Sequence, residues 1–186
     1  SPQNIDLYAR YNISKEHFII CSVARLSKVK RFDLLFKALY ALNSVHLILV
    51  GDGLERDTLH DLAKTLKIQD RITFTGALDN QEAKNIIAAS NLFVMSSDKE
   101  GFPYTFIESM FCKTPFISTP VSDLPRFIHP NYVVPFNDEK ALTDVLKYAQ
   151  SHYNETIESF QNLFEKAQMQ FTVEHMTQET IDVYKK

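Results

Sequence analysis

Short apolar runs alternate with longer amphipathic stretches along most of the chain. Each run is continuously apolar and is followed by turn-forming residues, which is typical of a parallel strand buried on both faces. The predicted strands are residues 17–24, 45–50, 71–74, 91–95, 115–118 and 132–134. Between these runs, leucine, isoleucine and alanine recur at helical spacing. The helices predicted there are residues 31–42, 55–66, 81–89 and 104–112.

After residue 137 the pattern is helical only, and helices are predicted over residues 139–150, 155–168 and 173–184. Strand–helix alternation of this kind implies a parallel sheet with right-handed crossovers. The sequence therefore predicts a single α/β domain over residues 1–186. We expect a Rossmann-like, three-layer domain with a parallel sheet of about six strands, helices on both faces and a C-terminal helical tail.

Composition and charge narrow the class of protein. The chain has 186 residues, of which 45% are hydrophobic, and a net charge of -3. This fraction is too high for a disordered chain, and the apolar runs are too short to cross a bilayer. The slight acidity argues against a nucleic-acid partner. Because no signal-like segment starts the sequence, we expect a cytoplasmic protein.

The two cysteines and six histidines do not suggest a metal site. Cys21 and Cys112 lie far apart within apolar stretches, so we expect two buried free thiols in a reducing compartment and no disulfide. The histidines are not spaced as metal ligands are. We therefore expect no bound metal.

Turn residues gather just after the predicted strands. All four glycines lie there, and six of the seven prolines fall between Pro103 and Pro135. In an open parallel sheet, ligands bind beyond the carboxyl ends of the strands. The distribution therefore indicates a ligand cleft at this edge, although ordinary turns also need glycine and proline.

A basic heptad, residues 25–31, follows the first predicted strand. It holds the four cations Arg25, Lys28, Lys30 and Arg31 and no acidic residue. Arginine binds the oxygens of a phosphate through a planar fork and lysine as a point charge, so this patch could hold a diphosphate. The alternative is a solvated loop.

After the second strand, Gly51 and Gly53 form a G-x-G sequence. The dinucleotide fingerprint needs a third glycine where Arg56 stands, and it normally follows the first strand. A dehydrogenase is rejected for these two reasons, while a tight turn facing a ligand remains possible.

Two glutamates, Glu100 and Glu108, follow the fourth predicted strand. Between them, Pro103 is placed at a helix start, and the backbone N–H groups of Tyr104 and Thr105 would face the cleft and suit an anion. Glu108 lies about one turn inside an otherwise apolar helix. Because burying an unpaired carboxylate is costly, it needs either a lysine or the hydroxyls of a ligand as a partner.

Taken together, these residues resemble the group 1, or family-four, retaining glycosyltransferases. Residues 22–26 with Lys30 resemble the arginine-and-lysine element of that family, and residues 100–108 resemble its paired-glutamate motif. Further segments fit the same family in the same order, namely residues 49–53, 71–76 and 113–115. The resemblance covers the chain from about His17 to the last predicted helix.

This resemblance implies a GT-B fold, in which two Rossmann-like domains face a cleft and the C-terminal one holds the nucleotide sugar. The chain resembles that donor-binding half. Its implied activity is retaining transfer from a UDP-, GDP- or ADP-sugar to a glycan, lipid-linked or small-molecule acceptor, as in polysaccharide biosynthesis, with no metal or other cofactor. The N-terminal acceptor domain would be its partner, and any peripheral membrane contact would be made by that half. Residues 171–186 resemble the helix that, in this family, packs back across the N-terminal domain.

The resemblance also implies roles for individual residues. Arg25 and Lys30 would contact the diphosphate and stabilise charge on the leaving group, and with Glu100, which would contact the donor sugar, they form the expected catalytic set. Glu108 would bind the ribose hydroxyls. Backbone groups near Phe74 and Gly76 would line the base pocket, and amides after Phe102 would meet the phosphates. The other expected donor-binding positions are Gly51, Gly101, Pro103, Tyr104 and Thr105.

Two other functions fit the fold. One is half of a sugar-nucleotide epimerase, and the other is a non-catalytic nucleotide-binding module such as a flavodoxin-like regulatory domain. The glutamate pair and the arginine–lysine element favour the transferase over the epimerase. A receiver domain needs acidic residues after its early strands, where this chain has Arg25 and Ser27. The chain also departs from the glycosyltransferase pattern, because Ser122 and Asp123 replace the Gly-Gly that usually opens a loop beside the donor sugar.

Overall fold

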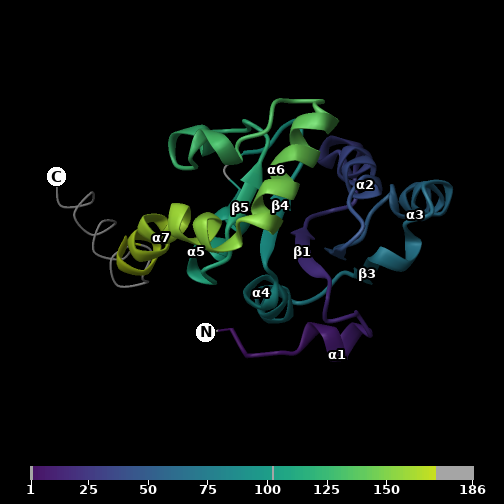
Figure 1. The fold of residues 1–186 in the computed structure, drawn as a ribbon, viewed down its shortest axis with the longest axis horizontal. Coiled ribbons are helices and arrows are strands. Elements are labelled where there is room, and N and C mark those ends of the chain that lie inside the picture. The colour runs from purple at the N-terminus through teal and green to yellow at the C-terminus, as the bar shows by residue number, and fades with distance from the viewer. Residues whose placement is uncertain (1, 102, 171–186) are drawn as a thin grey trace, which may run out of the picture.

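Five parallel strands form the centre of the computed structural model, which describes residues 2–101 and 103–170 (Figure 1). The strand order across the sheet is β3-β2-β1-β4-β5. Every residue of β2 is buried, as expected of a strand covered on both faces. The Rossmann-like α/β prediction is therefore confirmed. The strands are β1 (Phe18–Val23), β2 (Val45–Val50), β3 (Ile72–Gly76), β4 (Leu92–Met95) and β5 (Phe116–Ser118).

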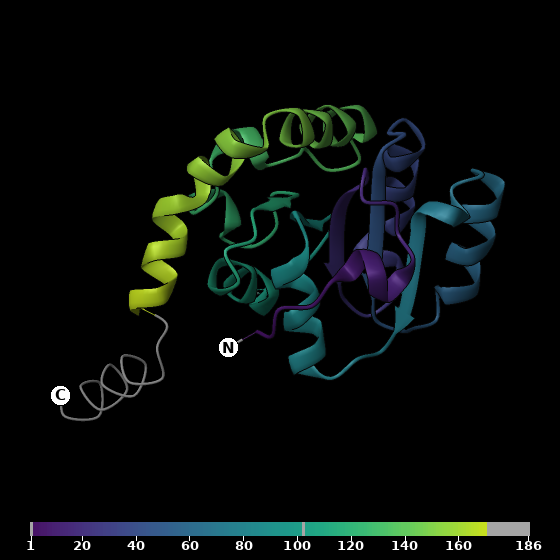
Figure 2. The same ribbon diagram turned by 60° about the horizontal axis from the view of Figure 1, so that its bottom comes forward.

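The helices cover both faces of the sheet (Figure 1). With right-handed crossovers, α2 and α3 lie on one face as the chain moves from β1 to β3, and α4 and α5 lie on the other as it returns through β4 to β5. The α6 helix packs on α2 and α7 packs on α5, so these two helices run from one face towards the other (Figure 2). The α-helices are α1 (Leu7–Tyr11), α2 (Phe32–Tyr40), α3 (Arg56–Thr65), α4 (Asn80–Ala89), α5 (Tyr104–Phe111), α6 (Glu139–Ser151) and α7 (Tyr153–Gln170).

Four short 3-10 helices complete the described chain: η1 (Lys28–Lys30), η2 (Gln69–Arg71), η3 (Leu124–Arg126) and η4 (Pro130–Tyr132). Within residues 2–101 and 103–170, no helix has both the length and the apolar character that a membrane span requires. The helix predicted at residues 173–184 lies outside the described residues.

The sixth strand predicted at residues 132–134 is wrong. Pro130 starts η4, which takes up Tyr132, and Val133 makes only an isolated parallel bridge to Ser118. A proline at each end of this segment (Pro130 and Pro135) removes backbone donors that a longer ladder would need. Tyr132 is almost fully buried, as a strand residue would be, but it belongs to the 3-10 helix η4.

The cysteines are free, as expected. Cys21 is fully buried in β1, and burial raises the pKa of its thiol to about 12. Cys112 follows α5 and is half-buried, so the expectation of full burial fails there, and burial raises its pKa to about 11. Neither thiol is activated as a nucleophile at neutral pH, because only the thiolate reacts readily.

The strand order reverses between β1 and β4, and the ladder between these two strands is short. The strand β1 pairs with β2 along its whole length, but with β4 only at Ile20–Leu92 and Cys21–Phe93. Beyond that point the Ser22 hydroxyl donates to the backbone oxygen of Val94 at 2.5 Å, where the regular ladder has ended. Such a switch point is where ligands of open α/β sheets bind.

Candidate functional site

Two loops meet at the switch point, one after β1 (residues 25–31) and one after β4 (residues 96–101). The Ser96 hydroxyl donates to the backbone oxygen of Lys30 at 2.8 Å, and the Asp98 amide donates to the backbone oxygen of Val29, also at 2.8 Å. These bonds fix the 96–101 loop against the 25–31 loop. Side chains that are 70 residues apart in sequence are thereby brought together.

The central contact is an ion pair between Lys30 and Glu100. Lys30 Nζ lies 2.5 Å from Glu100 Oε1, and the two side chains are only 19% and 14% exposed. The Ser97 hydroxyl donates to the same carboxylate oxygen at 2.6 Å. The structure thus brings together the lysine and the glutamate that the sequence assigned to one site.

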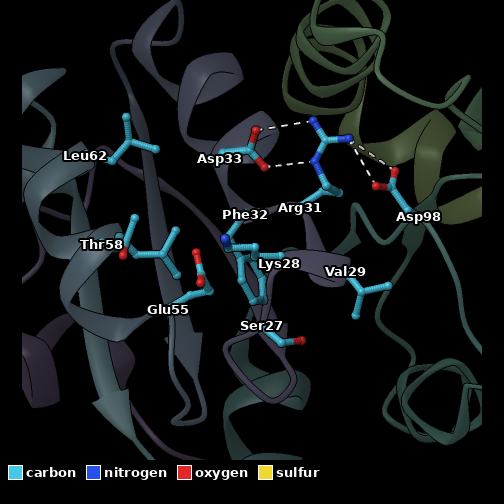
Figure 3. A pocket seen from close by; sticks show the side chains of 11 residues that line it. Ser27, Lys28, Val29, Arg31, Phe32, Asp33, Glu55, Thr58, Leu62 and Asp98 are labelled. Atoms are coloured by element: carbon cyan, nitrogen blue, oxygen red, sulfur yellow. Dashed lines mark hydrogen bonds and ion pairs between the residues drawn. The ribbon is translucent and has the colours of Figure 1, made fainter.

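Arg31 holds the two loops together (Figure 3). Its guanidinium donates to both carboxylate oxygens of Asp33, at 3.0 and 3.2 Å, to both of Asp98 at 3.2 Å, and to the side-chain oxygen of Asn137. Burial raises the pKa of Asp33, but hydrogen bonding and charge from Arg31 outweigh it and hold that pKa below its ordinary value. Arg31 therefore acts as a structural clamp, and it lines a pocket of about 460 Å³ between the 25–31 loop and α3.

Arg25 has a different environment. Its side chain is exposed and has no hydrogen-bond or ion-pair partner among the described residues. The backbone on both sides of it is fixed, because the amides of Ala24 and Leu26 donate to the backbone oxygens of Val50 and Asp52 at 3.0 and 2.9 Å. A free guanidinium on a rigid loop at the sheet edge can bind an anion without first breaking a salt bridge.

The two glycines after β2 allow this loop to approach. A Cβ atom at Gly51 would lie 1.9 Å from the backbone oxygen of Ala24, and one at Gly53 would lie 2.2 Å from that of Leu26. Gly51 also has a φ of 137°, which other residues rarely adopt. The G-x-G turn therefore supports the loop that carries Arg25, and direct contact of Gly51 with a ligand stays a prediction.

Glu108 lies on α5 and faces a pocket of about 530 Å³ that is also lined by Lys84 of α4 and Tyr104. The Glu108 side chain is 23% exposed, and Lys84 Nζ lies 3.7 Å from its Oε1. The lysine partner considered from the sequence is thus present, but this distance is too long for a hydrogen bond. The carboxylate keeps its capacity to accept bonds from a ligand.

The start of α5 has the features expected of an anion site. Pro103 is the N-cap, with extended backbone, so the amides of Tyr104 and Thr105 belong to the first turn and lack intrahelical acceptors. The Thr105 hydroxyl is buried without a partner in the described part of the chain. Around Gly101 there is open space. The role expected for the amides near Phe102 falls partly outside the described residues, because Phe102 is not among them.

Two further predicted positions lie at the carboxyl end of β3. The Phe74 ring stacks on the His60 ring, with 3.9 Å between the ring centroids, and meets the Phe36 ring edge-on, with 6.0 Å between the centroids. The Phe74 side chain therefore packs against α2 and α3. Gly76 has a φ of 72° and open space around it, and its oxygen accepts the Gly51 amide at 2.9 Å. That backbone groups of this segment line a base pocket stays a prediction.

Three residues were not identified from the sequence: Ser97, Arg31 in its clamping role, and Thr119, whose hydroxyl donates to the backbone oxygen of Ser97 at 2.5 Å. No spacing rule in the sequence could have paired them with their acceptors. Ser122, where the family pattern usually has a glycine, adopts a φ of 52°, in the left-handed region that glycine favours. Among residues 2–101 and 103–170, no three His, Cys, Asp or Glu side chains are grouped so as to hold a metal ion.

Comparison with known proteins identifies the family. The sequence profile described as "Glycosyl transferases group 1" matches residues 5–168, which include both loops of the site. The chain belongs to this family. Membership confirms the resemblance on which the expected residue roles depend.

Individual relatives agree with this assignment. The chain is 32% identical over 158 residues to the N-acetyl-alpha-D-glucosaminyl L-malate synthase of Bacillus anthracis, covering 80% of this chain and 41% of that protein. Among solved structures, sucrose-phosphate synthase from Thermosynechococcus elongatus superposes with a TM-score of 0.87 at 26% identity, over 99% of this chain and 49% of that one. Anabaena HepE, solved with UDP and glucose, also superposes with a TM-score of 0.87, at 22% identity. That match covers 96% of this chain and 51% of the HepE chain. The group 1 chain therefore spans about half the length of these relatives.

Proposed function

We propose that this group 1 chain is the donor-binding half of a retaining glycosyltransferase, and that it binds a nucleoside diphosphate sugar at the carboxyl edge between β1 and β4. The observation that carries the proposal is the Lys30–Glu100 pair at the switch point, with the free Arg25 on the same loop. Cations and a carboxylate at one edge of the sheet suit a ligand that joins a diphosphate to a hydroxyl-rich sugar.

In this proposal Arg25 and Lys30 bind the diphosphate. Departure of a nucleoside diphosphate leaves negative charge on its oxygens, and preorganised donors stabilise that charge without reorganisation. The first-turn amides of α5, at Tyr104 and Thr105, and the amide of Gly101 add donors on the other side, while Pro103, which has no N–H, shapes the start of the helix. Because these groups supply the positive potential, we propose that the reaction needs no metal.

Glu100 contacts hydroxyls of the donor sugar, and Glu108 accepts bonds from the ribose. The position of Glu108 supports this role, since its pocket also contains the exposed ring of Tyr104. Backbone groups of Phe74, Gly76 and Gly51 line the base. The relatives support a sugar nucleotide as the donor, because HepE was solved with UDP and glucose.

Catalysis also needs an acceptor held against the anomeric carbon, and such positioning can contribute about 7–11 kcal/mol. We propose that a second domain supplies this surface, since the chain spans about half of its relatives. The chain alone therefore binds donor and does not transfer sugar efficiently. We further propose that the enzyme works in the cytoplasm and that any membrane contact belongs to the other half.

Calorimetry with UDP, GDP and ADP, each with and without EDTA, tests the proposal. We expect at least one of them to bind with a Kd between micromolar and millimolar, roughly -4 to -8 kcal/mol, unchanged by EDTA. Loss of binding in EDTA would contradict the metal-free mechanism. Absence of binding by all three nucleotides would contradict the donor site itself.

A further inference from the structure

The Glu100 carboxylate is held through one of its two oxygens. Lys30 Nζ and the Ser97 hydroxyl both bond to Oε1, at 2.5 and 2.6 Å. Among the described residues, Oε2 has no hydrogen-bond partner. A carboxylate anchored in this way cannot rotate freely, and it presents one defined oxygen to a ligand.

Ser97 is itself fixed from the neighbouring strand. Its side chain is buried, with 2% of the residue exposed, and its backbone oxygen accepts the hydroxyl of Thr119 at 2.5 Å. Thr119 directly follows β5 and is equally buried. Two hydrogen bonds, one to the backbone of Ser97 and one from its hydroxyl, therefore connect the end of β5 to Glu100.

We propose that Ser97 is a positioning residue, which with Thr119 orients Glu100 so that Oε2 accepts a hydroxyl of the donor sugar. The lysine ammonium has three protons, so one can remain on Oε1 while the others reach the diphosphate. The Lys30–Glu100 pair then need not break when donor binds, and it sets the spacing between the phosphate contact and the sugar contact. This inference rests on the proposed donor-binding function.

The test separates sugar recognition from nucleotide recognition. Binding is measured for whichever of UDP, GDP or ADP the unmodified chain binds best, and for its glucose conjugate. In Ser97→Ala we expect the ratio of the two affinities to move at least about fivefold against the sugar conjugate, because a buried hydrogen bond to a charged group is lost. Affinity for the nucleoside diphosphate itself should stay within about twofold, because the hydroxyl does not contact it.

Two further variants keep the result interpretable. Thr119→Val is nearly isosteric and removes only the second hydroxyl, so it should shift the ratio in the same direction by less. Ser97→Thr keeps a hydroxyl, so it should retain the ratio even if its extra methyl lowers the melting temperature. The matched control is Ser90→Ala, which removes a buried hydroxyl that donates to Ile86 on α4 and should not change the ratio.

An unchanged ratio in Ser97→Ala would overturn the positioning role while leaving the donor site intact. Equal loss of nucleotide and sugar-nucleotide affinity in Ser97→Ala would show a merely structural role and overturn it as well. If the unmodified chain bound none of the three nucleotides, the proposed function would fail and this inference with it.

Discussion

Positive charge at the switch point is divided between paired and free side chains. Lys30 and Arg31 each hold carboxylates, whereas Arg25 has no partner among the described residues. Lys28 lies on the same loop but lines the pocket beside α3. Arg25 and Lys28 therefore form a matched pair of exposed cations on one loop with different surroundings.

This difference gives the first prediction. Arg25→Ala should weaken nucleoside diphosphate binding by about 1–3 kcal/mol, the range for hydrogen bonds to charged groups. Lys28→Ala should change it by less than about 0.5 kcal/mol, as expected of a screened surface charge. Calorimetry with the best-binding nucleotide measures both. Equal small losses would indicate a diffuse basic surface.

The second prediction concerns Glu108. Glu108→Gln should lower affinity for a nucleotide and leave affinity for inorganic pyrophosphate unchanged, because only the nucleotide carries a ribose. Its free energy of unfolding should change by less than about 1 kcal/mol, since the contact with Lys84 is long and partly exposed. A large stability loss with unchanged nucleotide affinity would instead make Glu108 a structural ion-pair member.

The sequence predicts residues for the candidate site but not the bonds between them. Arg25, Lys30 and Glu100 were assigned because their order and spacing resemble a family motif. The acceptors of Arg31 could not be found in this way, because Asp98 and Asn137 lie 67 and 106 residues away. Only the folded sheet brings these segments within hydrogen-bond distance.

At the scale of elements, the turn after β2 limits what the 25–31 loop can tolerate. Gly51→Ala should destabilise the domain by about 2 kcal/mol or more, because the new Cβ would meet the backbone of Ala24 and the φ of 137° would be strained. Chemical denaturation measures the loss. The control is Gly101→Ala, where a Cβ would enter open space and little change is expected. Equal stability of the two variants would contradict this account.

Long, continuously apolar strands were predicted well, and β2 was predicted with its observed bounds, Val45–Val50. The errors occur where elements are short. The α1 helix was missed because five residues, Leu7–Tyr11, are too few to show helical periodicity. The segment at Tyr132 has the composition of a strand, and the flanking prolines decide against one. Local constraints of this kind override an apolar pattern.

At the scale of the whole molecule, stability should depend on pH through His46 in β2. The residue is 6% exposed, and burial, with charge from His17 and Arg71, lowers its pKa to about 4. The Nε2 atom of its ring is hydrogen-bonded to the Thr73 hydroxyl at 2.8 Å. The ordinary value is 6.5, so the unfolded chain binds a proton that the folded chain excludes over this interval.

The free energy of unfolding should therefore fall as pH drops from about 6.5 to about 4, by an amount of order 3 kcal/mol, and level off below that as far as His46 is concerned. Urea denaturation at a series of pH values measures this. His46→Gln should flatten that part of the profile. A profile of unchanged slope in the variant would assign the effect to other groups.

The short ladder between β1 and β4 forms a seam in the sheet, with β3, β2 and β1 on one side and β4 and β5 on the other. Lys30 follows β1 and Glu100 follows β4, so the ion pair spans this seam. Backbone amides of β1 and β2, which share the longest ladder, would then exchange with solvent more slowly than those of β4 and β5. A donor that contacts both Lys30 and Glu100 would link the two parts of the sheet. Its binding would then slow amide hydrogen exchange in β4 and β5, including at residues that the donor does not contact.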